Sequence, residues 1–159
     1  MKTWLILSLM LSGLAPVWAD EPPGTKPAFD AALAAQLGAD EHGADEHGMH
    51  SYVLVILKTG PTPLPKGEKR DAMFKGHFAN MERLASEGKL AYAGPLDGKD
   101  GWRGMFIFSV PTIEEAKALA ETDPVIINGE MIAEYHVHYG SAALRAVNGM
   151  HQRIQQKPF

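Results

Sequence analysis

Cysteine is absent from the 159-residue sequence, which excludes disulfide bonds and lipid attachment at a cleavage-site thiol. A basic excess is also missing, because 15 Lys and Arg residues face 19 Asp and Glu residues. Without surplus positive charge to neutralise phosphates, we expect no nucleic-acid partner. The hydrophobic content of 45% is typical of a globular domain with some extra length at its ends.

Long apolar runs are missing too. The stretch from Trp4 to Leu14 falls short of the roughly 20 residues that a membrane span needs. Lys2 precedes this stretch, and the small-x-small triplet Val17-Trp18-Ala19 follows it, as in a secretory signal. We therefore expect residues 1–19 to be a signal peptide, with an uncleaved anchor as the alternative. The mature protein is then periplasmic or secreted and holds no membrane contact.

Residues 20–50 form a low-complexity linker in this interpretation, with several prolines and one helical piece at Phe29–Leu37. The linker ends in GADEHGADEHGMH, which places acidic residues beside His42, His47 and His50. Imidazole and carboxylate groups together suit transition metals. However, the glycine-interrupted spacing matches no helical face. A disordered acidic linker and a weak metal-scavenging segment are both compatible with this pattern.

A packed domain is predicted from Ser51 onward. Strands are expected where β-branched and aromatic residues concentrate, at Tyr52–Leu57, Leu90–Ala93, Met105–Val110 and Met131–Tyr139. The proline-rich segment Thr59–Lys69 is an exposed loop in this prediction.

Helices are predicted by periodicity and by capping residues. An amphipathic helix ending before Gly88 has a buried stripe of Phe74, His77, Phe78, Met81, Leu84 and Ala85, and a solvent face of Lys75, Glu82 and Glu87. Thr112 and Glu115 have the spacing of a capping box. Asp123-Pro124 ends that second helix and starts a short turn at Val125–Asn128.

The order strand, helix, strand, strand, helix, strand predicts an α+β fold, the ferredoxin-like βαββαβ arrangement with a four-stranded antiparallel sheet and two helices on one face. Its first and third strands are central, which agrees with their continuous apolar runs. The uncovered sheet face then needs a partner, so we expect a homodimer. The domain covers 51–144, and 145–159 is a tail that is helical by its spacing and docks on the dimer.

His77 and Asp123 are the residues most suited to chemistry. His77 lies on the first helix and Asp123 at the turn after the second, and both helices are expected to pack on the same sheet face. One interpretation is structural, in which Asp123 caps the following turn and His77 bonds to the backbone. The other is a dyad, in which the carboxylate fixes the imidazole tautomer and leaves a general base.

These residues resemble those of the YCII-related family of small dimeric α+β barrel proteins. The resemblance covers roughly Ser51 to Leu144 and rests on His77 together with the motifs Glu87-Gly88-Lys89-Leu90, Ala93-Gly94-Pro95-Leu96, Glu114-Glu115-Ala116, Asp123-Pro124, Gly129 and Tyr139-Gly140. It implies a ferredoxin-like fold, face-to-face dimers and a His–Asp pair at His77 and Asp123. A dehydrochlorinase-like step on a hydroxylated aromatic ring is one activity associated with the family.

Other candidates lie elsewhere in the domain. Trp102 and Arg103, in the loop before the third strand, and Pro95 are expected to contact a substrate, with a plain exposed loop as the alternative. Glu134, His136 and His138 share one face of the last strand, where they form a candidate metal site or a solvated edge.

The sequence thus favours a small exported acid/base enzyme, of lyase or dehydrochlorinase type, that acts on a small organic molecule and needs no cofactor. The alternative is a non-catalytic module that binds a small ligand or a metal.

Overall fold

The computed structural model describes residues 28–37 and 44–157. The chain divides into two compact units, Met1–Asp30 and Ala31–Phe159, and the helices and strands of the described residues all lie in the second. The expected signal peptide, and the first histidine of the linker, His42, lie outside the described residues. Within the described ranges, no helix combines the length and apolar character required to cross a membrane.

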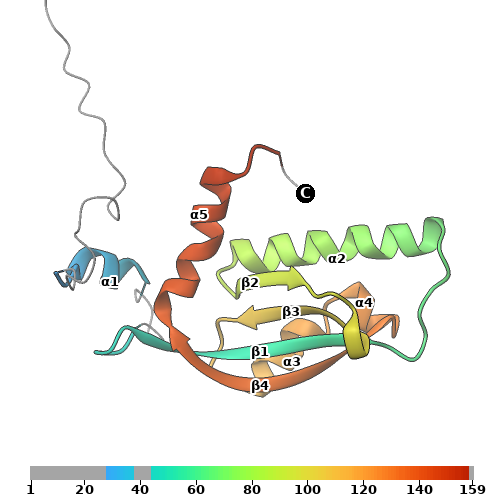
Figure 1. Cartoon of the computed structure of the whole chain (residues 1–159), viewed down its shortest axis with the longest axis horizontal. Coiled ribbons are helices and arrows are strands. Elements are labelled where there is room, and N and C mark those ends of the chain that lie inside the picture. Colours follow the sequence, from blue (N-terminus) through green and yellow to red (C-terminus); the bar gives the residue numbers. More distant parts are fainter. Residues whose placement is uncertain (1–27, 38–43, 158–159) are drawn as a thin grey trace, which may run out of the picture. The chain divides into compact units, whose positions relative to one another are not determined.

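A four-stranded sheet forms the centre of the domain, with the strand order β2-β3-β1-β4 (Figure 1). All three strand pairs are antiparallel. The strands are β1 (Met49–Thr59), β2 (Leu90–Pro95), β3 (Trp102–Phe108) and β4 (Met131–Ser141). The central places of β1 and β3 agree with their apolar runs, and the predicted ferredoxin-like topology is confirmed.

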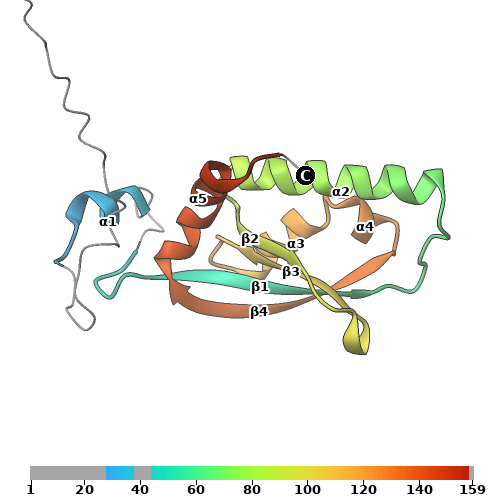
Figure 2. The same ribbon diagram turned by 45° about the horizontal axis from the view of Figure 1, so that its top comes forward.

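The helices of this topology cover one face of the sheet (Figure 2). They are α2 (Glu68–Ser86), α3 (Ile113–Ala120) and the single turn α4 (Pro124–Ile127). The core lies between these helices and the sheet, and its wholly buried side chains include Val53, Val55, Leu84, Phe108, Ala116 and Val125. Burial of this apolar surface is the main source of the domain's stability.

Helix α2 is longer than predicted and turned slightly about its axis. It begins at Glu68, inside the segment expected to be loop, and its buried residues are Met73, His77 and Leu84. The expected burial of Phe78 is wrong, because 52% of that side chain is exposed. His77 nevertheless lies on the buried face.

Local signals set the ends of these elements as the sequence predicts. The Thr112 Oγ1 accepts a hydrogen bond from the backbone N–H of Glu115 at 3.2 Å, which caps α3. Gly88, after α2, has a φ of +71°, and Gly129, after α4, has a φ of +68°. Both angles favour glycine, because a Cβ makes the left-handed region costly.

The loop between β1 and α2 is fastened to the segment before β4. Gly60 donates to the Glu130 carbonyl at 2.8 Å, and Thr62 donates to the Gly129 carbonyl at 3.0 Å. A Cβ on Gly60 would lie 2.8 Å from the carbonyl carbon of Gly129, closer than atoms normally approach. The two backbones can therefore meet only because residue 60 is glycine.

The C-terminal segment folds back onto its own sheet. Leu144, in the 3₁₀ segment η2 (Ala142–Ala146), packs against a second cluster formed by Tyr52, Ala91 and Ile107. In α5 (Val147–Ile154), the Asn148 side chain donates to the Leu90 carbonyl at 2.6 Å. The tail is thus helical as predicted, and it covers one end of the second sheet face within the same protomer.

The end of the predicted linker belongs to the folded domain. Strand β1 begins at Met49, and His50 is buried, with its Nε2 3.0 Å from the Ser109 Oγ. The Asp45 carboxylate accepts hydrogen bonds from the backbone N–H groups of His47 and Met49, which orders the entry into the strand. The prediction of a disordered linker is therefore wrong for this part, whereas the predicted helical piece is present as α1 (Ala31–Leu37).

Candidate functional site

A glycine in the middle of α2 lets α4 approach the helix closely. A Cβ on Gly76 would lie 3.1 Å from the Pro124 Cγ, which is tighter than ordinary van der Waals contact. Pro124 begins α4, and the residue before it is Asp123. Because His77 follows Gly76, this close approach brings the imidazole to the carboxylate.

His77 and Asp123 are hydrogen-bonded in the structure, although 46 positions separate them in the sequence. The His77 Nδ1 lies 2.9 Å from Oδ1 and 2.8 Å from Oδ2 of Asp123. Asp123 is 1% exposed, and its Oδ1 also accepts the backbone N–H of Val125 at 3.1 Å. The carboxylate therefore performs the capping role of the structural interpretation and holds the imidazole as well.

Three aromatic rings lie close to the imidazole. The ring centroids of Phe74, Phe78 and Phe106 lie 5.9, 5.4 and 6.1 Å from that of His77. The His77 side chain keeps 9% of its surface exposed. In the described part of the chain, the one fully buried side-chain nitrogen or oxygen without a hydrogen bond belongs to Asn80.

This geometry specifies what the imidazole can do. A carboxylate accepts hydrogen bonds, so the Nδ1 facing it carries a hydrogen, and in the neutral ring Nε2 then carries the lone pair. An imidazole held in one tautomer by a carboxylate is the arrangement used by general bases. The pair thus has the geometry of a base and its orienting partner.

A buried ion cluster at the start of α2 escaped the sequence analysis. Glu130, just before β4, is 1% exposed. It accepts a hydrogen bond from the Leu64 backbone at 2.7 Å and one from the Arg70 guanidinium at 2.9 Å. Arg103 of β3 lies 3.8 Å from the same carboxylate. Burial raises the pKa of Glu130, but the donors from Leu64 and Arg70 and the charges of Arg70 and Arg103 outweigh it, and the pKa lies below its ordinary value.

One signal in the sequence could have revealed part of this cluster. Arg70, Phe74 and His77 have the spacing i, i+4, i+7, which is one stripe of a helix. The Arg70 guanidinium lies 4.5 Å from the centre of the Phe74 ring. No comparable pattern marks Glu130, because it precedes the alternating part of its strand.

The three residues predicted to bind substrate lie together at one end of the sheet. Trp102 and Arg103 belong to β3 rather than to a loop, and Pro95 pairs with Gly104 beside them. Trp102 is 42% exposed and lies beneath the Lys58 ammonium group at 5.9 Å. Among the described residues, no hydrogen bond or ring contact joins these three to His77 or Asp123. The structure instead brings Arg103 to Glu130.

The candidate metal site on β4 is not assembled. The His136 Nε2 lies 2.8 Å from Oε1 of Glu134, whose other oxygen pairs with Lys58. The ring of His138 lies against Gly140, since a Cβ there would be 3.3 Å from its Cδ2. The imidazole of His136 therefore contacts Glu134, whereas that of His138 lies against Gly140, and the two rings do not face a common site. Within the described ranges, no three His, Asp or Glu side chains are grouped for a metal ion.

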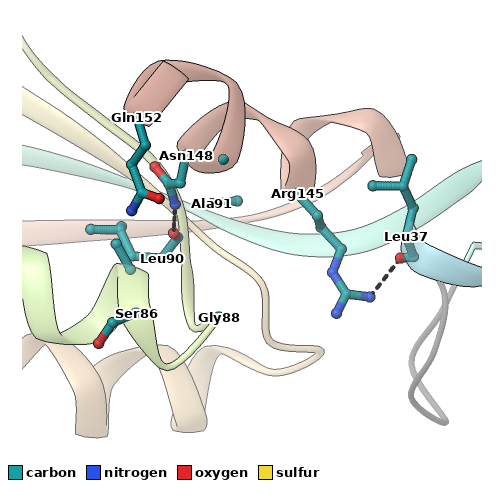
Figure 3. Close-up of a pocket in the computed structure, with 10 residues that line it drawn as sticks. Leu37, Ser86, Gly88, Leu90, Ala91, Arg145, Asn148 and Gln152 are labelled. Atoms are coloured by element: carbon teal, nitrogen blue, oxygen red, sulfur yellow. Dashed lines mark hydrogen bonds between the residues drawn. The ribbon is translucent and has the colours of Figure 1, made fainter. Parts of the chain in front are cut away.

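A pocket of about 310 Å³ lies at the other end of α2 (Figure 3). Its walls come from the end of α2, the start of β2, η2, α5 and the last residue of α1. Arg145 donates to the Leu37 carbonyl at 2.8 Å, and Asn148 to the Leu90 carbonyl, so two of its polar side chains bond to its own walls. Neither His77 nor Asp123 lines this pocket.

The fold and this buried imidazole–carboxylate pair define a small α+β domain of the ferredoxin-like class. Residues 51–139 match the YCII-related domain, which is more than half of the chain, and the protein belongs to that family. A comparison with curated protein sequences finds no significant match.

One solved structure to which the chain is similar is the 5-chloro-2-hydroxyhydroquinone dehydrochlorinase from Burkholderia phenoliruptrix AC1100, determined in complex with 2,5-dihydroxybenzoquinone. The two sequences are 23% identical, the match covers 55% of this chain and 90% of that chain, and the TM-score is 0.39.

Proposed function

We propose that this protein catalyses proton transfer on a small organic molecule in a lyase-type reaction. His77 is the general base, and Asp123 orients its ring. The observation that carries the proposal is the contact of Nδ1 with both carboxylate oxygens, which leaves Nε2 to accept a proton from an acidic C–H or O–H bond. In an elimination, the electron pair of that C–H bond forms the new double bond while the leaving group departs with its own pair.

Binding of the substrate is assigned to Trp102, Arg103 and Pro95. These residues come from neighbouring β2 and β3 and meet at the end of the sheet where α2 begins. Trp102 offers an exposed ring for stacking, and Arg103 offers a guanidinium. A positioned general base typically contributes a factor of about 10² to 10⁴ to the rate.

The test compares wild type with His77→Gln and Asp123→Asn. The glutamine side chain keeps a hydrogen-bond donor near Asp123, so it preserves the fold better than alanine does. Substrates are screened by proton NMR in D₂O for exchange of acidic hydrogens, and by chloride release from chlorinated hydroxyquinols. We expect His77→Gln to lose at least a hundredfold in rate. Full activity in a folded His77→Gln protein would refute the proposal.

A second candidate function is ligand binding without turnover, and the pocket in Figure 3 favours it. Its volume of about 310 Å³ is at the lower end of the range for small-molecule sites. Binding that survives His77→Gln but is lost when Gln152→Trp fills this pocket would support the binding module instead.

We propose that the protein is exported to the periplasm or the medium, on the basis of the signal-like sequence of residues 1–19. N-terminal sequencing of the protein recovered from an expressing cell should give Asp20 as the first residue. Recovery of the intact N-terminus in the cytoplasmic fraction would contradict it.

We also propose a homodimer that packs sheet face against sheet face. The helices α2, α3 and α4 cover one face (Figure 2), and Leu144 covers only one end of the other. Partly buried Leu54 and Met105 continue that second cluster along β1 and β3. An apolar face of this kind is usually covered by a partner in small domains.

A further inference from the structure

The buried carboxylate of Glu130 already has its hydrogen bonds. One oxygen accepts from the Leu64 backbone at 2.7 Å and the other from Arg70 at 2.9 Å. Arg70 also supplies the positive charge that balances the carboxylate. These two contacts hold the start of α2 and the preceding loop to the beginning of β4, which is a sufficient structural role for the pair.

Arg103 is a second cation beside Glu130, although Arg70 alone balances the charge of that carboxylate. Its guanidinium lies 3.8 Å from Oε1 of Glu130, beyond the 2.7 to 3.2 Å range of hydrogen bonds. The side chain is only 28% exposed. No residue in the described part of the chain accepts a hydrogen bond from it, although a guanidinium carries five N–H donors. Two arginines and one glutamate leave a local charge of plus one.

A guanidinium with this much free donor capacity is suited to a planar oxyanion. Arginine binds carboxylates through two parallel N–H···O bonds, which a lysine cannot imitate. Glu130 holds Arg103 in place by charge without occupying its donors. The nearby Lys58 does not compete for the same anion, because it is paired with Glu134.

We propose that Arg103, supported by Arg70 and Glu130, binds the carboxylate of a small organic anion. This inference rests on the proposed function and names the class of its substrate. Arg70 and His77 lie seven residues apart on one stripe of α2, which is about 10 Å along the helix. Phe74 lies between them, 4.5 Å from the Arg70 guanidinium and 5.9 Å from the His77 ring. Arg70 and Arg103 both lie beside Glu130, so the charge is recognised at the start of α2, and His77 acts at the other end of the same stripe.

The probes for the test are benzoate and its neutral isostere benzamide, titrated against the full chain by NMR at low salt. The variants are Arg103→Gln, which removes the charge, and Arg103→Lys, which keeps the charge but cannot form two parallel N–H···O bonds. Arg153→Gln, on the exposed face of α5, is the control for the overall loss of one positive charge. Thermal unfolding of each variant shows that the fold is intact.

We expect benzoate to bind wild type at least tenfold more tightly than benzamide. Arg103→Gln should abolish that preference, Arg103→Lys should keep a small part of it, and Arg153→Gln should keep it all. Added salt should weaken benzoate binding and leave benzamide unchanged. Equal affinity of Arg103→Gln and wild type for benzoate, or no benzoate binding by wild type up to roughly 10 mM, would overturn the inference.

The two proposals fail in different ways. If benzoate binding depends on Arg103 but no proton transfer is found in any variant, the anion site stands and the catalytic proposal fails. If proton transfer depends on His77 but is equally fast with Arg103→Gln on anionic substrates, the anion site fails alone.

Discussion

The carboxylate of Asp123 joins His77 on α2 to the first turn of α4. Its oxygens lie 2.9 and 2.8 Å from the imidazole Nδ1, and Oδ1 also accepts the N–H of Val125 at 3.1 Å. One buried side chain therefore stabilises the fold and orients the candidate base. Substitutions that keep one role and remove the other can separate them.

Asp123→Ala should destabilise the protein by about 2 to 4 kcal/mol, because it removes an N-cap worth about 1 kcal/mol and leaves a buried imidazole without its partner. Asp123→Asn keeps an acceptor for the N–H of Val125 and should lose less than half of that. The exposed cap Thr112 is the control, and Thr112→Ala should cost only about 1 kcal/mol. Urea unfolding measures all three, and equal losses for Asp123→Ala and Thr112→Ala would contradict the paired role.

Gly76→Ala should disturb the approach of α4 to α2. Its Cβ would lie 3.1 Å from the Pro124 Cγ, so α4 must shift, and overpacking of this kind typically costs about 1 to 3 kcal/mol. Gly149→Ala, in α5, is the matched control because its Cβ meets nothing within 4 Å. It should stabilise the protein by up to about 1 kcal/mol through helix propensity.

The readout that distinguishes the two glycines is the imidazole of His77. Its NMR signals should shift in Gly76→Ala and stay unchanged in Gly149→Ala, because only the first substitution moves Asp123. A gain in stability for Gly76→Ala with unchanged His77 signals would show that α4 does not need the glycine.

Most of the fold could be predicted because its signals are local. Alternation along β4, the cap at Thr112 and the break at Asp123-Pro124 each involve residues within a few positions of one another. The topology placed His77 and Asp123 on one sheet face, but their contact was only what the family resemblance implied. The start of β1 was harder to predict from the sequence, because its first residues are ordered by the Asp45 carboxylate and by pairing with β4.

The cluster around Glu130 could not be predicted in the same way. Glu130 meets Arg70 across 60 positions, and Leu64 across 66. A single glutamate after a glycine carries no periodic signal, and nothing in the sequence marks it as buried. Arg103 was expected to bind substrate, but its position beside a buried carboxylate depends on a long-range contact between the start of β3 and the residue before β4.

Glu130→Gln should destabilise the protein at pH 7 by about 2 kcal/mol, because Arg70 loses the carboxylate that balances it. The pKa of Glu130 is lowered from its ordinary 4.5, so the ionised form is the one that the folded state favours. Its stabilising contribution is complete above about pH 4.5 and is lost as the pH falls through the lower folded value. The stability difference between wild type and Glu130→Gln should therefore shrink on acidification.

Glu134→Gln is the control for this pH dependence. The pKa of Glu134 is also lowered, first by the hydrogen bond from Lys58 and then by that from His136, but its side chain is 45% exposed. An exposed ion pair contributes little to stability, because water and salt screen it. Urea unfolding between pH 7 and pH 3.5 should show a large, pH-dependent deficit for Glu130→Gln and a small one for Glu134→Gln. A deficit for Glu130→Gln that stays constant with pH would contradict the ion-pair account.

Leu54→Arg should convert the proposed dimer into a monomer. Leu54 is partly buried beside the Tyr52 cluster on the sheet face opposite the helices, and a buried unpaired charge in a face-to-face contact costs several kcal/mol. Ile154→Arg is the control, because Ile154 in α5 is 74% exposed and lies outside that cluster. Sedimentation velocity should give a dimer for wild type and Ile154→Arg and a folded monomer for Leu54→Arg. A monomeric wild type at tens of micromolar, or a dimeric Leu54→Arg, would show that the second sheet face is not the contact.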